Sequence, residues 1–376
     1  MRKTYDAVIV GARAAGAATA LLLARAGARV LLVDRAPEIG DTLSTHALMR
    51  PSVELLANWG LLDPLVGAGT PWVRRARFQY GSDATVIPIR PTDAAPGLVA
   101  PRRWLLDALL VDAASQAGAE LRLGAAAEAC LRDGAGRMAG VELRVQDRRH
   151  PVYAGIVIGA DGRTSAIATA VGAKTQAISP HRTTTLYSYV PGIPNEGYRW
   201  YFGDGVTAGA IPTNDGLHCV FAACRPAEHG ARFADARAGM TTILAQFDAT
   251  LADGFASDPA ARIRRFPGAP GHIRARAGDG WALIGDAAFF KDPATAHGIT
   301  DAFLDADALA GCLARGEGPY AYADARHAPA LRLFDVTQRI ASLDWSLDDL
   351  RPLHDRLNAC IRDEHAAMIP RLAATG

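Results

Sequence analysis

The chain has 376 residues, of which 49% are hydrophobic and 21% charged, and its formal net charge is +1. Enough apolar side chains are present for a large core, and the balanced charge argues against a nucleic-acid partner. No apolar run approaches the ~20 residues that span a bilayer, and the chain begins directly on an expected strand without a signal sequence. We therefore expect a cytoplasmic protein with no membrane span.

The cysteines do not have the paired spacing of a zinc site, so we expect reduced, mostly buried thiols and no bound metal. They are Cys130, Cys219, Cys224, Cys312 and Cys360.

The N-terminal segment predicts a dinucleotide site. A buried strand is expected at residues 5–10, followed by a glycine turn from Gly11 to Gly16, an alanine-rich helix, and a second strand at 29–33 that ends at Asp34. The N-terminus of such a helix offers N–H groups and a positive dipole end to a pyrophosphate, and the acid is placed to bind a ribose. Arg13 replaces the usual second glycine, and its guanidinium either folds beside the pyrophosphate or lies in solvent.

Two later segments add to this pattern. After an expected strand at 154–158, Asp161 lies between glycines and Gly162 suits a turn, although an ordinary loop turn is the alternative for this segment alone. After an expected strand at 281–284, the stretch from Gly285 to Ile299 leads into a helix. The apolar spacing of that helix is carried by Ala302, Phe303, Ala306, Leu309 and Ala310.

Strand patterns occupy the middle of the chain. Residues 77–89 alternate as strands do, and 184–224 contain several β-rich runs separated by turn residues, so we expect one sheet. A helix at about 240–251 should pack on it, and the chain after residue 320 should be mostly helical.

Together these segments resemble the FAD-dependent monooxygenases of the p-hydroxybenzoate hydroxylase family, whose superfamily also contains flavin halogenases and geranylgeranyl reductases. The resemblance implies an α/β fold in which a Rossmann-like, glutathione-reductase-like FAD-binding domain carries an inserted β-sheet substrate domain and a helical C-terminal segment. The expected boundaries are 1–75, 98–180 and 272–319 for the discontinuous FAD-binding domain, 76–97 and 181–271 for the substrate domain, and 320–376 for the C-terminal segment.

The resemblance also implies site residues. The expected cofactor-binding residues are Gly11, Ala12, Arg13, Ala15, Gly16, Asp34, Arg35, Arg103, Asp161, Gly162, Gly285, Asp286, Gly298 and Ile299. The candidate catalytic residues are His46, His297 and Pro293, and a structural role for either histidine stays open. The expected substrate pocket contains Tyr187, Tyr189, Trp200 and Phe202, with core packing as the alternative for each of these aromatic side chains.

The activity implied by the resemblance is a monooxygenation. NAD(P)H reduces FAD, molecular oxygen forms a flavin C4a-hydroperoxide, and one oxygen atom passes to an apolar or aromatic small-molecule substrate. NAD(P)H binds the same chain, which the Asp161 segment favours, or a separate flavin reductase supplies the electrons.

Two alternatives stay open. Asp292 and Pro293 are similar to the corresponding pair in halogenases and reductases. Halogenation is disfavoured, because the tryptophan and the Ile-Pro pair of the halogenase signature are far apart in this chain, as Trp200 and Ile211-Pro212. A flavin-dependent reductase or dehydrogenase of an isoprenoid-like substrate is therefore one alternative, and a non-catalytic flavin-binding protein is the other.

Overall fold

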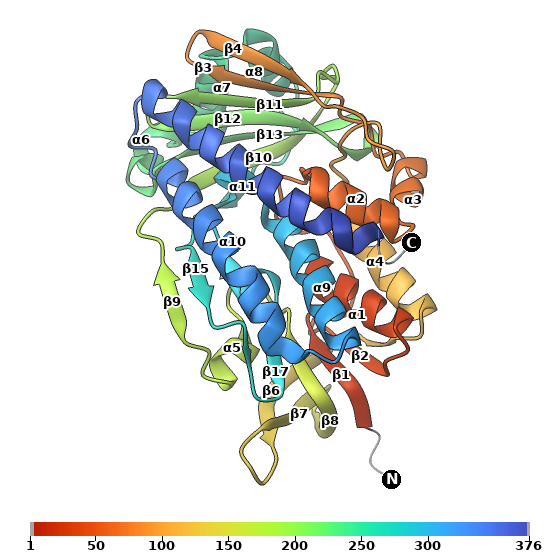
Figure 1. Cartoon of the computed structure of the whole chain (residues 1–376). Coiled ribbons are helices and arrows are strands. Elements are labelled where there is room, and N and C mark those ends of the chain that lie inside the picture. The colour runs from red at the N-terminus through yellow and green to blue at the C-terminus, as the bar shows by residue number, and fades with distance from the viewer. Residues whose placement is uncertain (1–3, 374–376) are drawn as a thin grey trace.

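An eight-stranded sheet forms the lower part of the molecule in Figure 1, which shows a computed structural model that describes residues 4–373. Its main path runs β16-β17-β8-β1-β2-β5, and β7 pairs with β8 and β6. The strands are β1 (Thr4–Val10), β2 (Val30–Val33), β5 (Glu120–Arg122), β6 (Ala125–Arg132), β7 (Met138–Val145), β8 (Arg148–Gly159), β16 (Ala277–Gly278) and β17 (Trp281–Leu283). Strand β1 pairs in parallel with β2 and β8, and its residues 7–10 are all apolar and buried, as in a parallel sheet covered on both faces.

Helices cover this sheet and bring distant parts of the chain together. Helix α1 (Ala14–Arg25) packs against both α4 (Arg103–Gln116) and α9 (Gly298–Ala314), although α9 lies at the other end of the sequence. The remaining helices of this part are α2 (Arg50–Asn58), α3 (Leu62–Gly67) and α5 (Ala166–Ala170). The predicted strands at 5–10, 29–33, 154–158 and 281–284 are confirmed, with β8 extending well before residue 154.

A seven-stranded sheet lies above the first in Figure 1, in the order β14-β10-β13-β12-β11-β3-β4. Its strands are β3 (Arg75–Tyr80), β4 (Asp83–Pro88), β10 (Thr184–Pro191), β11 (Tyr198–Gly203), β12 (Val206–Pro212), β13 (Leu217–Cys224) and β14 (Arg264–Phe266). The two predicted β-rich regions therefore join one sheet, as expected. Helix α6 (His229–Arg232) follows β13.

The single helix predicted at 240–251 is wrong, because the structure has α7 (Ala236–Ala245) and α8 (Ala249–Ala256) instead. Asp248 separates them. Its carboxylate accepts hydrogen bonds from the Leu251 N–H (2.9 Å), which caps α8, and from the Tyr201 hydroxyl (2.7 Å).

Strand alternation divides the seven-stranded sheet into two faces. Tyr187, Tyr198 and Trp200 belong to the core shared with the first sheet and its helices, whereas Leu186 and Tyr201 pack with α7 and α8. Tyr198 fixes the two parts to each other. Its hydroxyl donates to the carbonyl of Val99 (2.8 Å) and accepts from the N–H of Leu48 (3.2 Å).

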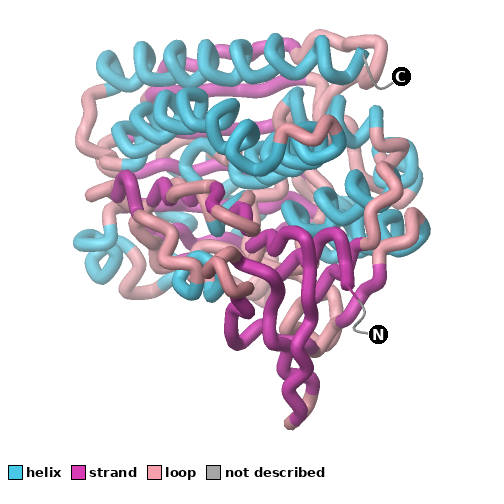
Figure 2. The backbone as a smooth tube through the Cα atoms, turned by 60° about the horizontal axis from the view of Figure 1, so that its bottom comes forward, coloured by secondary structure: helices cyan, strands magenta, loops and turns pink. Residues whose placement is uncertain are grey.

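Two long helices, α10 (Gly318–Ala341) and α11 (Leu347–Ala373), confirm the expected helical C-terminal segment and run across the front of the molecule in Figure 1. A three-stranded sheet of β9 (Thr175–Ile178), β15 (His272–Arg274) and β18 (Phe289–Phe290) was not predicted. Figure 2 shows the helices gathered over the strands, with strands protruding at the bottom.

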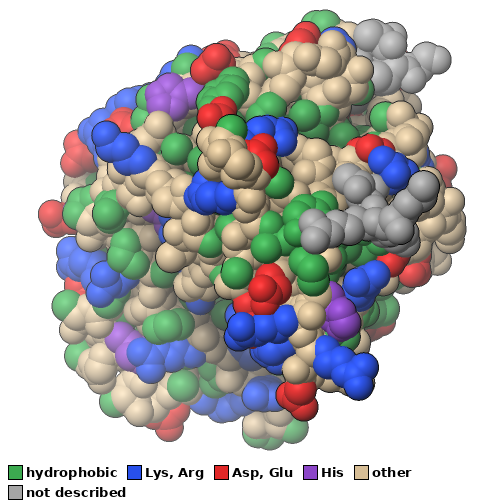
Figure 3. All heavy atoms as spheres, turned by 90° about the horizontal axis from the view of Figure 1, so that it is seen from below, with side chains coloured by type: hydrophobic (Ala, Val, Ile, Leu, Met, Phe, Trp, Pro, Cys, Tyr) green, Lys and Arg blue, Asp and Glu red, His purple; other side chains and the backbone are tan. Residues whose placement is uncertain are grey.

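The face in Figure 3 carries basic, acidic and apolar side chains together, as the balanced composition predicts. Within residues 4–373, no helix combines the length and apolar character needed to cross a membrane.

Candidate cofactor and substrate site

One cavity of about 630 Å³ extends from the glycine turn to the seven-stranded sheet. It brings the three predicted segments together, and much of the expected site lies on its wall. The predicted residues that line it are Gly11, Arg13, Ala15, Asp34, Arg35, Arg103, Asp161, Gly162, Asp286, Pro293, Gly298, Ile299 and Tyr187. Ala12, Gly16 and Gly285 lie just behind the wall and shape it.

The glycine turn requires both of its glycines. Gly11 has φ +107°, and a Cβ atom on Gly16 would lie 1.8 Å from the Gly11 carbonyl oxygen. The Ala12 N–H donates to Asp34 Oδ2 (2.8 Å), so the acid also stabilises the turn. Helix α1 starts at the cavity without a side-chain cap, which leaves first-turn N–H groups for an anion.

Arg13 forms an ion pair with Asp107. Its Nη1 donates to the Gly40 carbonyl (2.9 Å) and to Asp107 Oδ2 (3.2 Å), while Arg103 makes a bidentate pair with the same carboxylate. The Asp107 side chain is fully buried. Two guanidinium groups share one carboxylate, so this wall keeps a net positive charge where a pyrophosphate would lie.

Replacing Arg13 by glycine, which restores the usual turn, should weaken FAD binding about tenfold at low salt, or ~1.4 kcal/mol. Asp107 keeps Arg103 as its partner, so the fold should survive. Titration of the apoprotein with FAD at two salt concentrations measures this, with Arg29→Gly as the exposed control. Equal affinity for Arg13→Gly and wild type would mean that Arg13 contributes nothing to cofactor binding.

Asp161 has a local structural role. Its carboxylate accepts hydrogen bonds from the Ser165 hydroxyl (2.5 Å) and from the N–H groups of Ala166 (2.7 Å) and Ile167 (3.2 Å), which caps α5. Gly162 has φ +79°, the left-handed conformation expected of the turn. The segment therefore offers the cavity mainly its backbone.

Asp286 instead presents a carboxylate to the cavity. No other group within residues 4–373 donates a hydrogen bond to that carboxylate, and its burial raises its pKa, against the opposing effect of Lys291. The preceding Gly285 has φ +55°, and its N–H donates to Asp305 Oδ2 (3.0 Å). Asp305 lies on α9, so this helix fixes the turn that positions Asp286.

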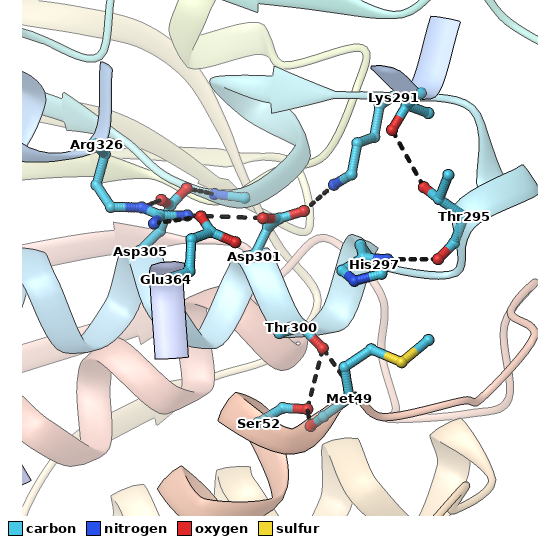
Figure 4. A network of polar contacts seen from close by, with 12 residues as sticks. Met49, Ser52, Lys291, Thr295, His297, Thr300, Asp301, Asp305, Arg326 and Glu364 are labelled. Atoms are coloured by element: carbon cyan, nitrogen blue, oxygen red, sulfur yellow. Dashed lines mark hydrogen bonds and ion pairs between the residues drawn. The ribbon is translucent and has the colours of Figure 1, made fainter. Parts of the chain in front are cut away.

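The segment after β18 forms a further wall. Lys291 lines the cavity and pairs with Asp301, as Figure 4 shows. His297 is buried, and its Nδ1 faces the Thr295 carbonyl oxygen. Burial, and next the charge of Lys291, lower the pKa of His297 to about 3. The imidazole is therefore neutral at neutral pH and does not supply a positive charge.

His46 is a buried, neutral histidine behind the wall. It has φ +65°, and its Nε2 lies 2.6 Å from the Tyr189 hydroxyl oxygen. Burial lowers the pKa of His46 to about 3, against the raising effect of Asp41. Arg102 pairs with Asp41 and lies 3.7 Å from the Tyr189 ring centroid. This group braces the wall at residues 42–47 and does not itself line the cavity.

Of the four aromatic residues expected in the substrate pocket, only Tyr187 lines the cavity. Tyr189 lies behind it with His46. The Trp200 ring packs on Phe221, with centroids 5.7 Å apart, and Phe202 packs under α11 against His354, with centroids 4.6 Å apart. The other side chains that line this end carry no sequence signal, namely Leu43, Thr185, Cys219, Phe221, Phe266 and Phe290.

A cavity with these features at the C-terminal ends of a parallel Rossmann-like sheet defines a flavin-dependent oxidoreductase. Residues 4–330 match the family described as FAD binding domain, and the chain belongs to that family. The resemblance and the fold class expected from the sequence are thereby confirmed.

The similar proteins differ in the reaction that their names give. Digeranylgeranylglycerophospholipid reductase 1 of Methanopyrus kandleri is 29% identical over 320 residues, which cover 80% of this chain and 78% of the relative. Menaquinone reductase of Mycolicibacterium smegmatis is 29% identical over 376 residues, covering 91% and 85%. PqsL of Pseudomonas aeruginosa, described as a probable FAD-dependent monooxygenase, has a TM-score of 0.75 at 21% identity, covering 96% and 100%, a likeness of fold alone.

Proposed function

We propose that this protein is an FAD-dependent monooxygenase that uses NAD(P)H and molecular oxygen to insert one oxygen atom into a compact aromatic or apolar molecule. The observation that carries the proposal is the aromatic end of the cavity. Tyr187, Phe221, Phe266 and Phe290 line the same cavity as Pro293 and its neighbours.

The residues on the wall fit FAD. The α1 N-terminus, with Arg13 and Arg103, would hold the pyrophosphate, and Asp34 would hold the adenosine ribose. Asp286 is a free acceptor for the ribityl hydroxyls. The flavin ring would then reach Pro293, Gly298 and Ile299, beside the sheet. When bound, FAD supplies hydride acceptance from NAD(P)H and activation of oxygen.

The sheet wall would hold the substrate and exclude water. Burial raises the pKa of the Cys219 thiol to about 12 and raises the pKa of the Tyr187 hydroxyl as well, so neither side chain ionises near neutral pH. An oxygen transfer needs an enclosed, dry position more than it needs an acid or base from this wall. The dinucleotide would lie between the α1 N-terminus and Pro293, which leaves the aromatic end of the cavity for a compact substrate.

PqsL supports this choice by analogy, because its structure has been solved in complex with 2-aminobenzoylacetate, a compact aromatic compound. For electron supply we propose NAD(P)H binding to the same chain, with a separate flavin reductase as the alternative. The two are distinguished by adding NADPH or NADH to the purified holoprotein alone.

A second candidate function is the reduction of an isoprenoid-like substrate without oxygen. The observation that favours it is the identity of the relatives, which are reductases of digeranylgeranylglycerophospholipids and of menaquinone.

The two functions predict different products. For a monooxygenase, a panel of compact aromatic compounds should include one that yields a product in air but not under nitrogen, with one atom of ¹⁸O from ¹⁸O₂ per turnover. For a reductase, product should form under nitrogen and gain two hydrogen atoms. Mass spectrometry of both reactions decides, and hydrogenated product without label would replace the monooxygenase proposal by the second candidate.

A further inference from the structure

A buried network of charged side chains lies behind the cavity wall formed by residues 291–299. It contains three basic and three acidic groups. The basic groups are Arg276, Lys291 and Arg326, and the acidic groups are Asp301, Asp305 and Glu364. They come from the loop after β15, the loop after β18, and helices α9, α10 and α11, so the C-terminal helices connect directly to the wall, as Figure 4 shows.

Lys291 is the member of this network that lines the cavity. Its side chain is only 4% exposed, and its ammonium pairs with Asp301 and lies 4.5 Å from the Phe289 ring centroid. Among the charges that act on the cavity-facing Asp286, that of Lys291 has the largest effect. The charge of Lys291 is therefore felt inside the cavity.

Asp301 is the direct ion-pair partner of the Lys291 ammonium. One carboxylate oxygen pairs with Lys291, and Arg326 Nη2 lies 3.6 Å from the other. Arg326 also donates to Asp305 (2.8 Å) and to Glu364 (2.9 Å), which holds it in place. Replacement of Lys291 thus leaves Asp301 beside Arg326, and replacement of Asp301 leaves Lys291 under the negative charges of Glu364 and Asp286.

Reduction of a flavin by two electrons and one proton from solvent adds one negative charge to the ring system. A buried cation stabilises that charge strongly, because screening by water is weak there. His297 belongs to the same segment without lining the cavity, and it is neutral and does not contribute a charge. Burial lowers the pKa of Lys291 to about 8, which leaves its ammonium mostly protonated at neutral pH, so Lys291 is the cation of this wall and Asp301 is its ion-pair partner.

We propose that Lys291 and Asp301 set the reduction potential of the bound flavin, with Lys291 raising it and Asp301 lowering it. Both side chains act on the flavin through the electrostatic field of their charges. The proposal rests on FAD binding, which the family assigns. It does not depend on whether the reaction is oxygen insertion or substrate reduction.

The test is an anaerobic dithionite titration of the holoprotein against a reference dye, for wild type, Lys291→Met and Asp301→Asn. Lys291→Met should make the potential more negative and Asp301→Asn less negative. Each should change the reduction equilibrium constant at least tenfold, about 30 mV for a two-electron couple. Thr300→Val is the neutral control, because Thr300 lies beside Asp301 on α9. The replacement removes hydrogen bonds with the Ser52 hydroxyl and the Met49 N–H without changing the charge.

Shifts of opposite sign with an unmoved control would establish the proposal, since general loosening of the wall does not reverse sign. Unchanged potentials, shifts of the same sign, or an equal shift in Thr300→Val would overturn it. If Lys291→Met does not fold, the direction of the Asp301→Asn shift decides alone. A wild-type protein without flavin affinity would overturn this proposal together with the proposed function, whereas bound flavin with unmoved potentials would overturn this proposal only.

Discussion

Gly16→Ala should abolish retention of FAD and lower the free energy of unfolding by about 1–3 kcal/mol, the usual cost of overpacking a tight site. The added Cβ atom would lie 1.8 Å from the Gly11 carbonyl oxygen and 3.2 Å from the Ala160 Cβ atom. Backbone on both sides must move, and it is the backbone that presents the first-turn N–H groups of α1 to the cavity. Flavin absorbance of the purified variant and its urea unfolding curve measure the two effects.

Gly67→Ala is the matched control for this prediction. Gly67 also lies in a helix, α3, but no heavy atom lies within 4 Å of an added Cβ atom. Since alanine has a higher helix propensity than glycine, the stability of the Gly67→Ala protein should be unchanged or slightly higher, with normal flavin content. A Gly16→Ala protein as stable and as flavin-rich as Gly67→Ala would show that the turn does not hold the cofactor.

Asp305→Ala should destabilise the protein by about 3–5 kcal/mol, because it leaves the buried Arg276 without its counter-charge and removes one of the carboxylates that pair with Arg326. The fully buried carboxylate accepts hydrogen bonds from Arg276 Nη1 (2.9 Å), Arg326 Nε (2.8 Å) and the Gly285 N–H (3.0 Å). Loss of the last bond also frees the turn that positions Asp286. We therefore expect loss of FAD together with loss of stability, measured by thermal unfolding and by flavin content.

Asp335→Ala on α10 is the control for the buried network. Its partner is Arg356, and both side chains are about half exposed, so its removal should cost no more than about 0.5 kcal/mol. Asp305→Asn removes the charge but keeps a polar acceptor, and its stability should fall between wild type and Asp305→Ala. Normal stability of Asp305→Ala would contradict the assignment of this network as a structural anchor.

The sequence was sufficient to predict the elements that bind the cofactor, because their signals are local. A glycine turn between an apolar strand and a helix requires only neighbouring residues, and Gly11 and Gly162 indeed adopt positive φ. The expectation that three distant segments share one site came from the family resemblance, and all three segments line one cavity.

The substrate wall was less predictable, because it depends on register between strands far apart in sequence. Tyr187 of β10 pairs with Phe221 of β13 and with Arg264 of β14, so these three residues share a sheet face. Alternation along one strand could not say that Phe221 lines the cavity while Phe202, also on that face, lies under α11.

The partners of the buried charged side chains could not be predicted from the sequence either. No local pattern indicates that Asp107 pairs with Arg13, because this pairing depends on how α4 packs beside α1. The same holds for Lys291 and Asp305, whose partners come from α9 and α10. The break between α7 and α8 did have a sequence signal, since Asp248 is a favoured N-cap residue.

The most direct test of the account is the absorbance spectrum of the purified protein before and after anaerobic addition of NADPH or NADH, and again after admission of air. We predict bound FAD that a nicotinamide bleaches and that air reoxidises. Bound FAD bleached by neither nicotinamide would contradict self-sufficient NAD(P)H use, and a protein with no affinity for flavin would contradict the central claim.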